Sequence, residues 1–255
     1  MSLVRSQADA LGMENKNVLL GVGAHPDDMD FGASGTIAKF IQEGWEAYYV
    51  LCTDGSRGSS DPEMTHAKLA QIRKDEQIEA GKVLGLKDVF FLNHQDTQLV
   101  CDLTLKEELV RIIRTVKPRI VFTMDPTFFY TKEPGYGGNH SINHTDHRAA
   151  GEATMDAVFP LCRDRLIFPE HEADGLGSHI VEELWFTSQQ EPRHIVDITG
   201  TFEKKLELLA KHQSQFDDWE GIKKRITTRA EEYGRLKGYR YAENFTRLLL
   251  PGHRK

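Results

Sequence analysis

The chain has 255 residues, a formal net charge of -7 and ordinary proportions of hydrophobic (39%) and charged (28%) residues. No linker-like stretch divides it, so we expect a flexible lead-in at residues 1–16 and one domain over residues 17–255. The acidic balance argues against nucleic acid as a partner, and no apolar run approaches the roughly 20 residues that span a bilayer. With no secretory signal in the first 17 residues, the widely spaced Cys52, Cys101 and Cys162 predict reduced thiols and a cytoplasmic location.

Short apolar runs and helical patterns alternate along the chain. The expected strands lie at residues 18–23, 47–53, 89–92, 120–124, 183–187 and 194–197. The expected helices lie at about 34–43, 63–85, 105–117, 147–159, 201–212 and 217–235, and no element is assigned to 238–247. Repeated strand–helix–strand units favour right-handed crossovers, so we predict a Rossmann-like three-layer α/β/α fold with a mainly parallel sheet. The loops that follow the parallel strands are then neighbours along one edge of the sheet.

The first expected strand ends in three ionisable residues within four positions, His25, Asp27 and Asp28. The carboxyl end of a buried strand is where open α/β sheets bind their ligands. His25 and Asp28 are suitable ligands for a divalent cation, and Asp27 between them is suited to proton transfer. The alternative is a simple turn in which one of the two aspartates caps the following helix.

A second cluster closes an unusually long loop, residues 125–146, after the fourth expected strand. His144 and His147 lie three residues apart with Asp146 between them, a spacing that can place both imidazoles on one side of a helical turn. A catalytic zinc typically takes three protein ligands and leaves a fourth position for water. The first cluster and one of these histidines could supply that set. The alternative is a helix start capped by Thr145 or Asp146, with solvated histidines.

Three motifs support a more specific interpretation. They are Ala-His-Pro-Asp-Asp at 24–28, Gly-x-x-Gly-Thr-Ile-Ala at 32–38 and His-x-Asp-His-Arg-Ala-x-Gly-Glu-Ala at 144–153. Together they resemble the PIG-L/LmbE-like zinc-dependent deacetylases, and weaker similarities extend over most of the chain, including His-Gln-Ser-Gln at 212–215. That family removes N-acetyl groups from N-acetylglucosamine-type substrates, so the resemblance implies a metal-dependent N-deacetylase.

The resemblance also implies roles for individual residues of the two clusters. It makes His25, Asp28 and His147 the ligands of one Zn²⁺ per chain, although two histidines and one aspartate would also admit other divalent metals. Asp27 becomes the general base, which would take a proton from the attacking water and deliver it to the leaving amine. The family often has an acidic residue at the next position, where this chain has Met29, and we interpret Met29 as a local packing variation.

By the same resemblance, His144 faces the developing oxyanion and Asp146 orients it. A protonated His144 would offset negative charge on the tetrahedral intermediate, and a carboxylate nearby would favour the protonated form.

Two further residues are candidates for holding the substrate. Arg57, in the second loop, could bind an anionic or hydroxyl-rich group by forked hydrogen bonds, or it could be a solvated loop arginine. Asp96, in the third loop, could contact sugar hydroxyls or serve only in a turn. Arg73 and Glu76 lie three apart on a long expected helix, and we interpret them as an ion pair on the helix surface or between helices.

The leading interpretation is therefore a cytoplasmic zinc hydrolase that deacetylates a small N-acetylated amino sugar or its glycoside. A metal-dependent hydrolase of another amide or of a phosphoester is an alternative, although phosphoryl chemistry often uses a pair of metal sites. A nucleotide-binding module is disfavoured because Gly21-x-Gly23 lacks the third glycine. A non-catalytic metal-binding α/β protein is the last alternative. The resemblance further implies a homo-oligomer, either a trimer or a hexamer.

Overall fold

The computed structural model describes residues 17–132, 139–187 and 194–252, so the expected lead-in at 1–16 lies outside the described residues. The strands are β1 (Val18–Gly23), β2 (Glu46–Thr53), β3 (Asp88–His94), β4 (Ile120–Met124), β5 (Glu183–Thr187), β6 (His194–Asp197) and β7 (Ala242–Leu249). The helices are α1 (Asp28–Gln42), α2 (His66–Leu84), α3 (Leu103–Val116), α4 (Thr145–Asp156), α5 (Glu170–Ala173), α6 (Phe202–Leu209) and α7 (Trp219–Arg235). A short π-helix, η3 (Ala157–Leu161), and a short 3₁₀-helix, η4 (Gln213–Gln215), are also present.

All seven of these strands form one sheet in the order β3-β2-β1-β4-β5-β7-β6. The first five strands in this order are parallel, and β7 runs antiparallel to both β5 and β6. In the register of the sheet, Val22 of β1 lies opposite Val50 of β2 and Thr123 of β4, so these strands end close together. The prediction of a mainly parallel sheet is confirmed.

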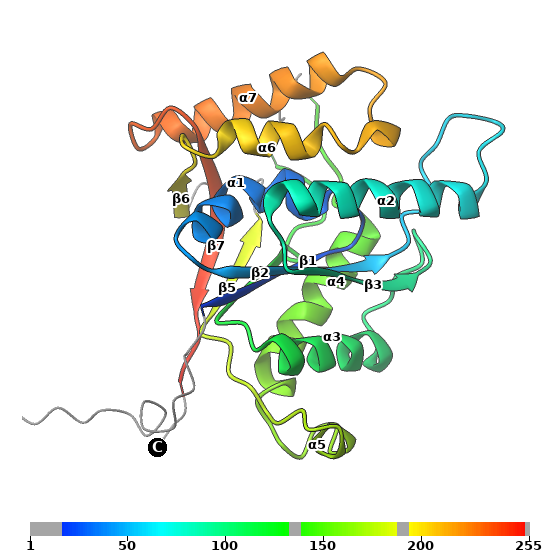
Figure 1. Ribbon diagram of the computed structural model, residues 1–255, viewed down its shortest axis with the longest axis vertical. Coiled ribbons are helices and arrows are strands. Elements are labelled where there is room, and N and C mark those ends of the chain that lie inside the picture. Colours follow the sequence, from blue (N-terminus) through cyan, green and yellow to red (C-terminus); the bar gives the residue numbers. More distant parts are fainter. Residues whose placement is uncertain (1–16, 133–138, 188–193, 253–255) are drawn as a thin grey trace, which may run out of the picture.

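Helices cover both faces of the sheet (Figure 1). One apolar core is shared by the sheet with α1, α2, α6 and α7, and it includes Ile37, Phe122 and Phe202. The core on the other face is shared with α3 and α4 and includes Leu109 and Ala153. These two cores make a single three-layer α/β/α domain, as predicted. Between β1 and β4 the strand order reverses, which is the point where folds of this kind bind ligands.

The start of α1 differs from the sequence prediction. A helix was expected from about residue 34, but α1 begins at Asp28. The chain turns sharply at Asp27, whose φ of 92° lies in the left-handed region, and the Asp28 carboxylate accepts a hydrogen bond from the His25 N–H. Aspartate is one of the few residues besides glycine that tolerate this backbone region. Met29, now in the first turn, is buried in the core as expected.

The unassigned tail contains β7, which inserts between β5 and β6. Its first half is buried and its last three residues are exposed. The buried part alternates Ala242 and Asn244 with the equally buried Glu243 and Phe245, so it lacks the polar–apolar alternation by which a strand is recognised from sequence. Glu243 is buried because it accepts hydrogen bonds from the Gly35 and Thr36 N–H groups of α1 and from Lys205.

Candidate active site

His25 lies directly after β1 and is surrounded by carboxylates. Its Nε2 is 3.1 Å from Asp96 Oδ1 and 3.2 Å from Asp146 Oδ2, and its Nδ1 is 3.5 Å from Asp28 Oδ2. Burial lowers the pKa of His25, but the hydrogen bonds to Asp146, Asp28 and Asp96 outweigh burial and raise the pKa to about 12. The site therefore strongly favours a positive charge at its centre.

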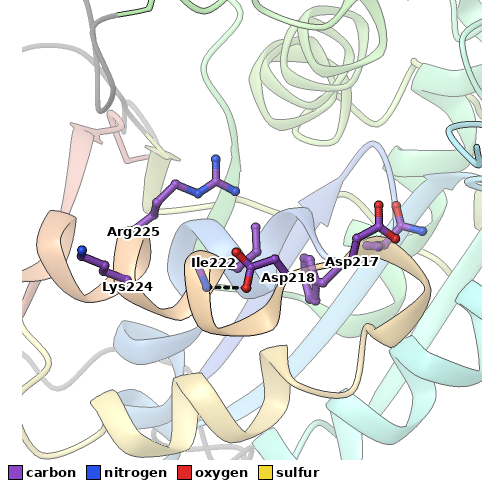
Figure 2. A pocket seen from close by; sticks show the side chains of 8 residues that line it. Asp217, Asp218, Ile222, Lys224 and Arg225 are labelled. Carbon is purple, nitrogen blue, oxygen red and sulfur yellow. Dashed lines mark hydrogen bonds between the residues drawn. The ribbon is translucent and has the colours of Figure 1, made fainter.

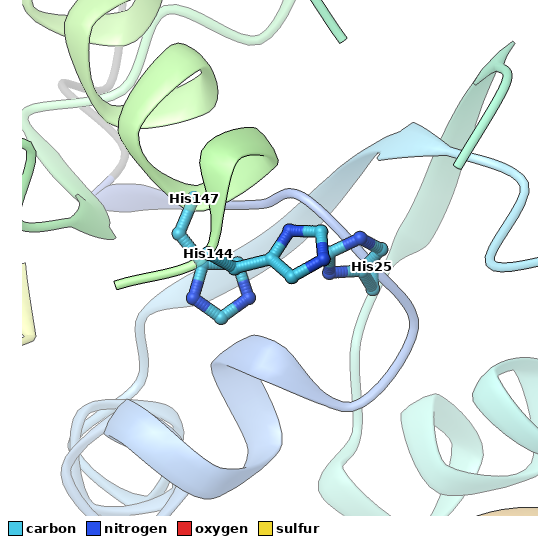
Figure 3. Close-up of side chains that lie close together, drawn as sticks. All are labelled: His25, His144 and His147. Carbon is cyan, nitrogen blue, oxygen red and sulfur yellow. The ribbon is translucent and has the colours of Figure 1, made fainter. Parts of the chain in front are cut away.

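The second cluster converges on the first from the start of α4. The ring of His25 lies 4.8 Å from the ring of His144 and 5.2 Å from the ring of His147, measured between centroids. Figure 3 shows these three rings together where α4 approaches the loop after β1. The Nε2 of His147 is 3.1 Å from Asp28 Oδ1. Residues more than 100 positions apart in the sequence thus form one site.

The distances among the predicted ligands can be compared with those of a zinc site. Two ligand atoms bonded to a tetrahedral zinc at about 2.0 Å each lie about 3.3 Å apart. The contacts of Asp28 with His147 (3.1 Å) and with His25 Nδ1 (3.5 Å) bracket this value. Burial raises the pKa of Asp28, but His147 and His25 outweigh burial and hold the pKa well below its usual range. The two contacts involve different Asp28 oxygens, and each taken singly has the spacing of two neighbouring ligand atoms around a divalent cation.

Among the described residues, two groups of three offer possible metal-binding atoms that all lie within 4.8 Å of one another. One group is His25, His144 and His147, and the other is His25, Asp96 and Asp146. The predicted set shares two histidines with the first group, and its third member, Asp28, contacts both of them. Either group could hold a metal, and His25 is a member of both.

The predicted orienting role of Asp146 toward His144 stays a prediction, and the shorter contact between the two residues involves the backbone of Asp146. The His144 Nδ1 accepts a hydrogen bond from the backbone N–H of Asp146, while the nearest approach of the two side chains is 4.0 Å. The Asp146 carboxylate is fully buried and accepts hydrogen bonds from the Thr97 and Leu99 N–H groups. Burial, followed by the charge of His25, lowers the pKa of His144, so this side chain is not held in a protonated form.

Asp27 is nearly buried beside Asp28 in a backbone conformation that costs about 1–3 kcal/mol for a residue other than glycine. Its Oδ2 lies 3.3 Å from Nη2 of Arg73, which belongs to α2. Burial raises the pKa of Asp27, Arg73 opposes this effect and Asp28 adds to it, and the net pKa is about 6. A carboxyl group with a pKa of about 6 is suited to exchanging protons near neutral pH.

The two predicted substrate-binding residues are held by neighbouring loops. Arg57 Nη1 donates a hydrogen bond to Thr97 Oγ1 (2.8 Å). Asp96 is buried. One of its oxygens accepts a hydrogen bond from the Arg57 N–H, and the other faces His25. Asp96 is therefore directed toward His25 and away from solvent, whereas Arg57 is half-buried at the edge of the site. Their roles toward a substrate stay predictions.

Comparisons with known proteins agree with this geometry. The sequence profile of the PIG-L family, described as GlcNAc-PI de-N-acetylase, matches residues 20–158, which include both clusters. The chain belongs to the PIG-L family. A curated relative, diacetylchitobiose deacetylase from Thermococcus kodakarensis, is 35% identical over 92% of this chain and 83% of its own length. This PIG-L chain is therefore related to deacetylases over almost its whole length.

Two further relatives extend the comparison. The structure of N,N'-diacetylchitobiose deacetylase from Pyrococcus horikoshii, complexed with its inhibitor MPG, superposes with a TM-score of 0.82 at 30% identity, covering 95% of this chain and 90% of that chain. A probable N-acetyl-alpha-D-glucosaminyl L-malate deacetylase 2 from Bacillus anthracis is 29% identical over 80% of this chain and 84% of its own length.

Sequence reasoning missed two residues of α2 that contact the site of this PIG-L chain. The sequence predicted that Arg73 forms an ion pair with Glu76. Instead, Arg73 is buried and donates hydrogen bonds to the Pro26 and Gly55 carbonyls. Gln77, also buried, accepts a hydrogen bond from the Asp27 N–H. The four-residue spacing of Arg73 and Gln77, which places both on one face of the helix, was the available signal. In a helix rich in charge, such a pair resembles a solvated surface.

A pocket of about 350 Å³ lies elsewhere, at the start of α7 (Figure 2). Acidic and basic side chains line it together, including Asp217, Lys224 and Arg225, and Asp218 accepts a hydrogen bond from the Gly221 N–H. None of the predicted site residues lines this pocket, and no predicted role falls on it.

No helix among the described ranges is long and apolar enough to cross a membrane.

Proposed function

We propose that this enzyme hydrolyses the N-acetyl amide of an N-acetylglucosamine-type sugar, with one zinc ion bound by His25, Asp28 and His147. The observation that carries the proposal is the contact of Asp28 with both histidines beside the nearly buried Asp27. Deacetylases act on such amides with water, and a serine or cysteine nucleophile is not needed. Family membership supports the reaction class.

In the group of His25, Asp96 and Asp146, we infer that the two aspartates orient the His25 ring and do not bind the metal themselves. Asp96 and Asp146 are buried and already accept backbone hydrogen bonds, which leaves little room for a substrate beside them. Histidine ligands usually donate their second ring N–H to a carboxylate, which fixes the ring and its tautomer. Asp96 and Asp146 supply this contact at Nε2 of His25, and Nδ1 is left to face Asp28. Zinc held by His25, Asp28 and His147 would supply a Lewis acid able to polarise the amide carbonyl and to lower the pKa of water.

Asp27 is the proton carrier in this proposal. Arg73 holds Oδ2, so we assign the proton to Oδ1, which takes it from the attacking water and later gives it to the leaving nitrogen. A pKa of about 6 allows both steps, because the carboxylate is ionised at neutral pH and can be protonated at little cost. Arg73 also keeps the carboxylate from turning away from the substrate.

His144 is placed to stabilise negative charge on the carbonyl oxygen. Because Nδ1 accepts the Asp146 N–H, the ring proton resides on Nε2, which can donate a hydrogen bond to the oxygen. The side chain is 40% exposed, compared with 25% for His147, so a substrate can reach it. This assignment keeps the predicted oxyanion role and replaces the charged imidazole with a neutral donor.

The substrate class follows from the relatives. Two of them are named for diacetylchitobiose and one for an N-acetylglucosaminyl malate, so all three names describe the deacetylation of an N-acetylated amino sugar. We propose a small N-acetylated amino sugar or glycoside as substrate.

The test is amine release from N-acetylglucosamine, diacetylchitobiose and an N-acetylglucosaminide, each with zinc-loaded protein. We expect release from at least one of these sugars and none from N-acetyl amino acids of similar size. Zinc-loaded, folded protein that releases amine from no sugar would contradict the proposal.

A further inference from the structure

A buried chain of hydrogen bonds extends from the end of α6 to Asp27. His212 Nε2 lies 2.7 Å from Asp30 Oδ2, and the same oxygen accepts a hydrogen bond of 2.9 Å from Gln77 Nε2. The Gln77 Oε1 in turn accepts a hydrogen bond of 2.9 Å from the Asp27 N–H. His212, Asp30 and Gln77 are at most 1% exposed. None of these three side chains has a role in the proposed reaction.

Gln77 and Arg73 hold opposite ends of one peptide group. The Asp27 N–H donates to Gln77, and the Pro26 carbonyl, which belongs to the same peptide, accepts from Arg73 Nη2 at 2.7 Å. Because N–H and C=O point in opposite directions in a trans peptide, two such contacts fix the plane of the peptide. That plane sets φ of Asp27, which lies at 92°.

The Asp30–His212 pair decides which end of the Gln77 amide faces Asp27. A glutamine amide can turn over and exchange its donor and acceptor ends. Asp30 accepts a hydrogen bond from the Nε2 end, so Oε1 is directed at the Asp27 N–H. His212, which also contacts this carboxylate, directly precedes the 3₁₀-helix η4, where Ser214 donates two hydrogen bonds to Glu76 of α2. The C-terminal part of the chain is thereby linked to the first loop.

We propose that Gln77, oriented by Asp30 and His212, is a positioning residue that holds Asp27 in the left-handed turn from which its carboxylate reaches the reacting atoms. The expected effect of Gln77 on the reaction rate rests on the proposed function. Its expected effect on the Asp27 backbone rests on the hydrogen-bond geometry alone. The inference assigns a role to His212 and Gln77, which lie in separate parts of the sequence and are both buried.

The test compares Gln77→Met, which removes both hydrogen bonds at similar volume, with Gln71→Met on the exposed side of the same helix. We expect at least a tenfold lower kcat in Gln77→Met, with KM and bound zinc unchanged, and wild-type values in Gln71→Met. Residue-resolved amide hydrogen exchange provides a second readout. The Asp27 amide should exchange at least tenfold faster in Gln77→Met, while the amides of β1 and β4 keep their protection.

A double variant tests the direction of the hydrogen bonds. When Gln77→Glu is combined with Asp30→Asn, the new carboxylate at position 77 still offers an oxygen to the Asp27 N–H. The new amide at position 30 can donate its N–H to the other oxygen of that carboxylate, and the number of buried charges is the same. We expect this double variant to recover at least a third of the wild-type kcat.

Three results would overturn the inference: a Gln77→Met kcat within twofold of wild type, a rate loss that only follows loss of zinc or general loss of amide protection, or a double variant no faster than Gln77→Met. Failure of the proposed function is distinct, because wild type itself would then release no amine.

Discussion

At the scale of single residues, the two nitrogens of His25 have different neighbours. Asp28 faces Nδ1, whereas Asp96 and Asp146 face Nε2. If Nδ1 binds the metal, Asp28 is a ligand and the other two carboxylates act through the ring. Substitutions on the two sides should therefore affect metal binding by different amounts.

Asp28→Ala and His147→Ala should abolish stoichiometric zinc binding, because each removes one of the three proposed ligands. Asp96→Asn should weaken zinc binding by about 10–100-fold, the usual effect of losing a partner that orients a ligand. Zinc titration with a competing chelator measures both effects. Full zinc affinity in Asp28→Ala, with loss of affinity in Asp96→Asn, would place the metal among His25, Asp96 and Asp146 instead.

His212 should make stability depend on pH. Burial lowers the pKa of His212, but the hydrogen bond and charge of Asp30, with the charges of Asp27 and Glu76, outweigh burial and raise it. Protonated His212 therefore contributes to the free energy of unfolding. This contribution is fully present below about pH 6.5, the pKa of an unfolded histidine, and is lost as the pH rises through the higher pKa of the folded state.

The free energy of unfolding of wild type should therefore exceed that of His212→Gln by more at pH 6 than at pH 9. Denaturant unfolding of both proteins at each pH measures this, and zinc binding affects both proteins alike. An equal difference at the two pH values would show that His212 does not carry the expected charge.

The sequence predicted which residues meet but not how several of them are turned. His25, Asp28 and His147 could be placed together because parallel strands end at one edge of a sheet. The inward direction of Asp96 and the approach of Arg73 depend on how a loop and α2 pack against the site. Such rotations are set by tertiary packing, which leaves little trace in local sequence pattern.

At the scale of elements, α4 lies unusually close to the end of β4. A Cβ on Gly151 would lie 2.4 Å from the Met124 carbonyl oxygen and 3.1 Å from Pro126. Backbone atoms cannot give way as side-chain tips do, so only glycine fits here. This explains why the motif that contains His144 and His147 has a glycine one turn further along the helix.

Gly151→Ala should displace the first turn of α4 and with it both histidines. We expect a loss of about 1–3 kcal/mol in the free energy of unfolding, typical of overpacking, together with weaker zinc binding. Gly177→Ala is the control, because no atom lies within 4 Å of its added Cβ and its φ is not in the left-handed region. Denaturant unfolding and zinc titration measure both effects. Wild-type behaviour of Gly151→Ala would contradict the close packing of α4 on β4.

Element boundaries show where local patterns were insufficient. Helix α1 begins six residues earlier than expected because Asp27 adopts a left-handed turn that a Pro-Asp-Asp sequence does not reveal. Strand β7 was missed because Glu243, an acid in a buried strand, is satisfied by α1 and Lys205, both distant in sequence.

At the scale of the whole molecule, the site joins the first loop, the loop after β3 and the start of α4 around His25, where we propose the metal binds. Binding of a metal to the folded state alone should therefore stabilise the entire domain. At a free zinc concentration of 100 times Kd the gain is about 2.7 kcal/mol.

Addition of zinc to chelator-treated protein should raise Tm by about 5–10 °C, since 1 kcal/mol corresponds to about 2–4 °C for a domain of this size. His147→Ala should show a much smaller rise at the same zinc concentration. Calorimetry of thermal unfolding checks both values, and an equal rise in the two proteins would indicate that the stabilising zinc binds elsewhere.

The expected trimer or hexamer stays a prediction.

The role of Asp27 is tested by measuring zinc content and amine release together in wild type and Asp27→Asn. Asp75→Asn, an exposed aspartate of α2, is the control. We predict one zinc per chain in all three proteins, and amine release from an N-acetylglucosamine-type sugar that is about 10²–10⁴-fold slower in Asp27→Asn alone, the usual range for loss of a general base. Amine release by Asp27→Asn at the wild-type rate, with zinc bound, would show that Asp27 is not the proton carrier.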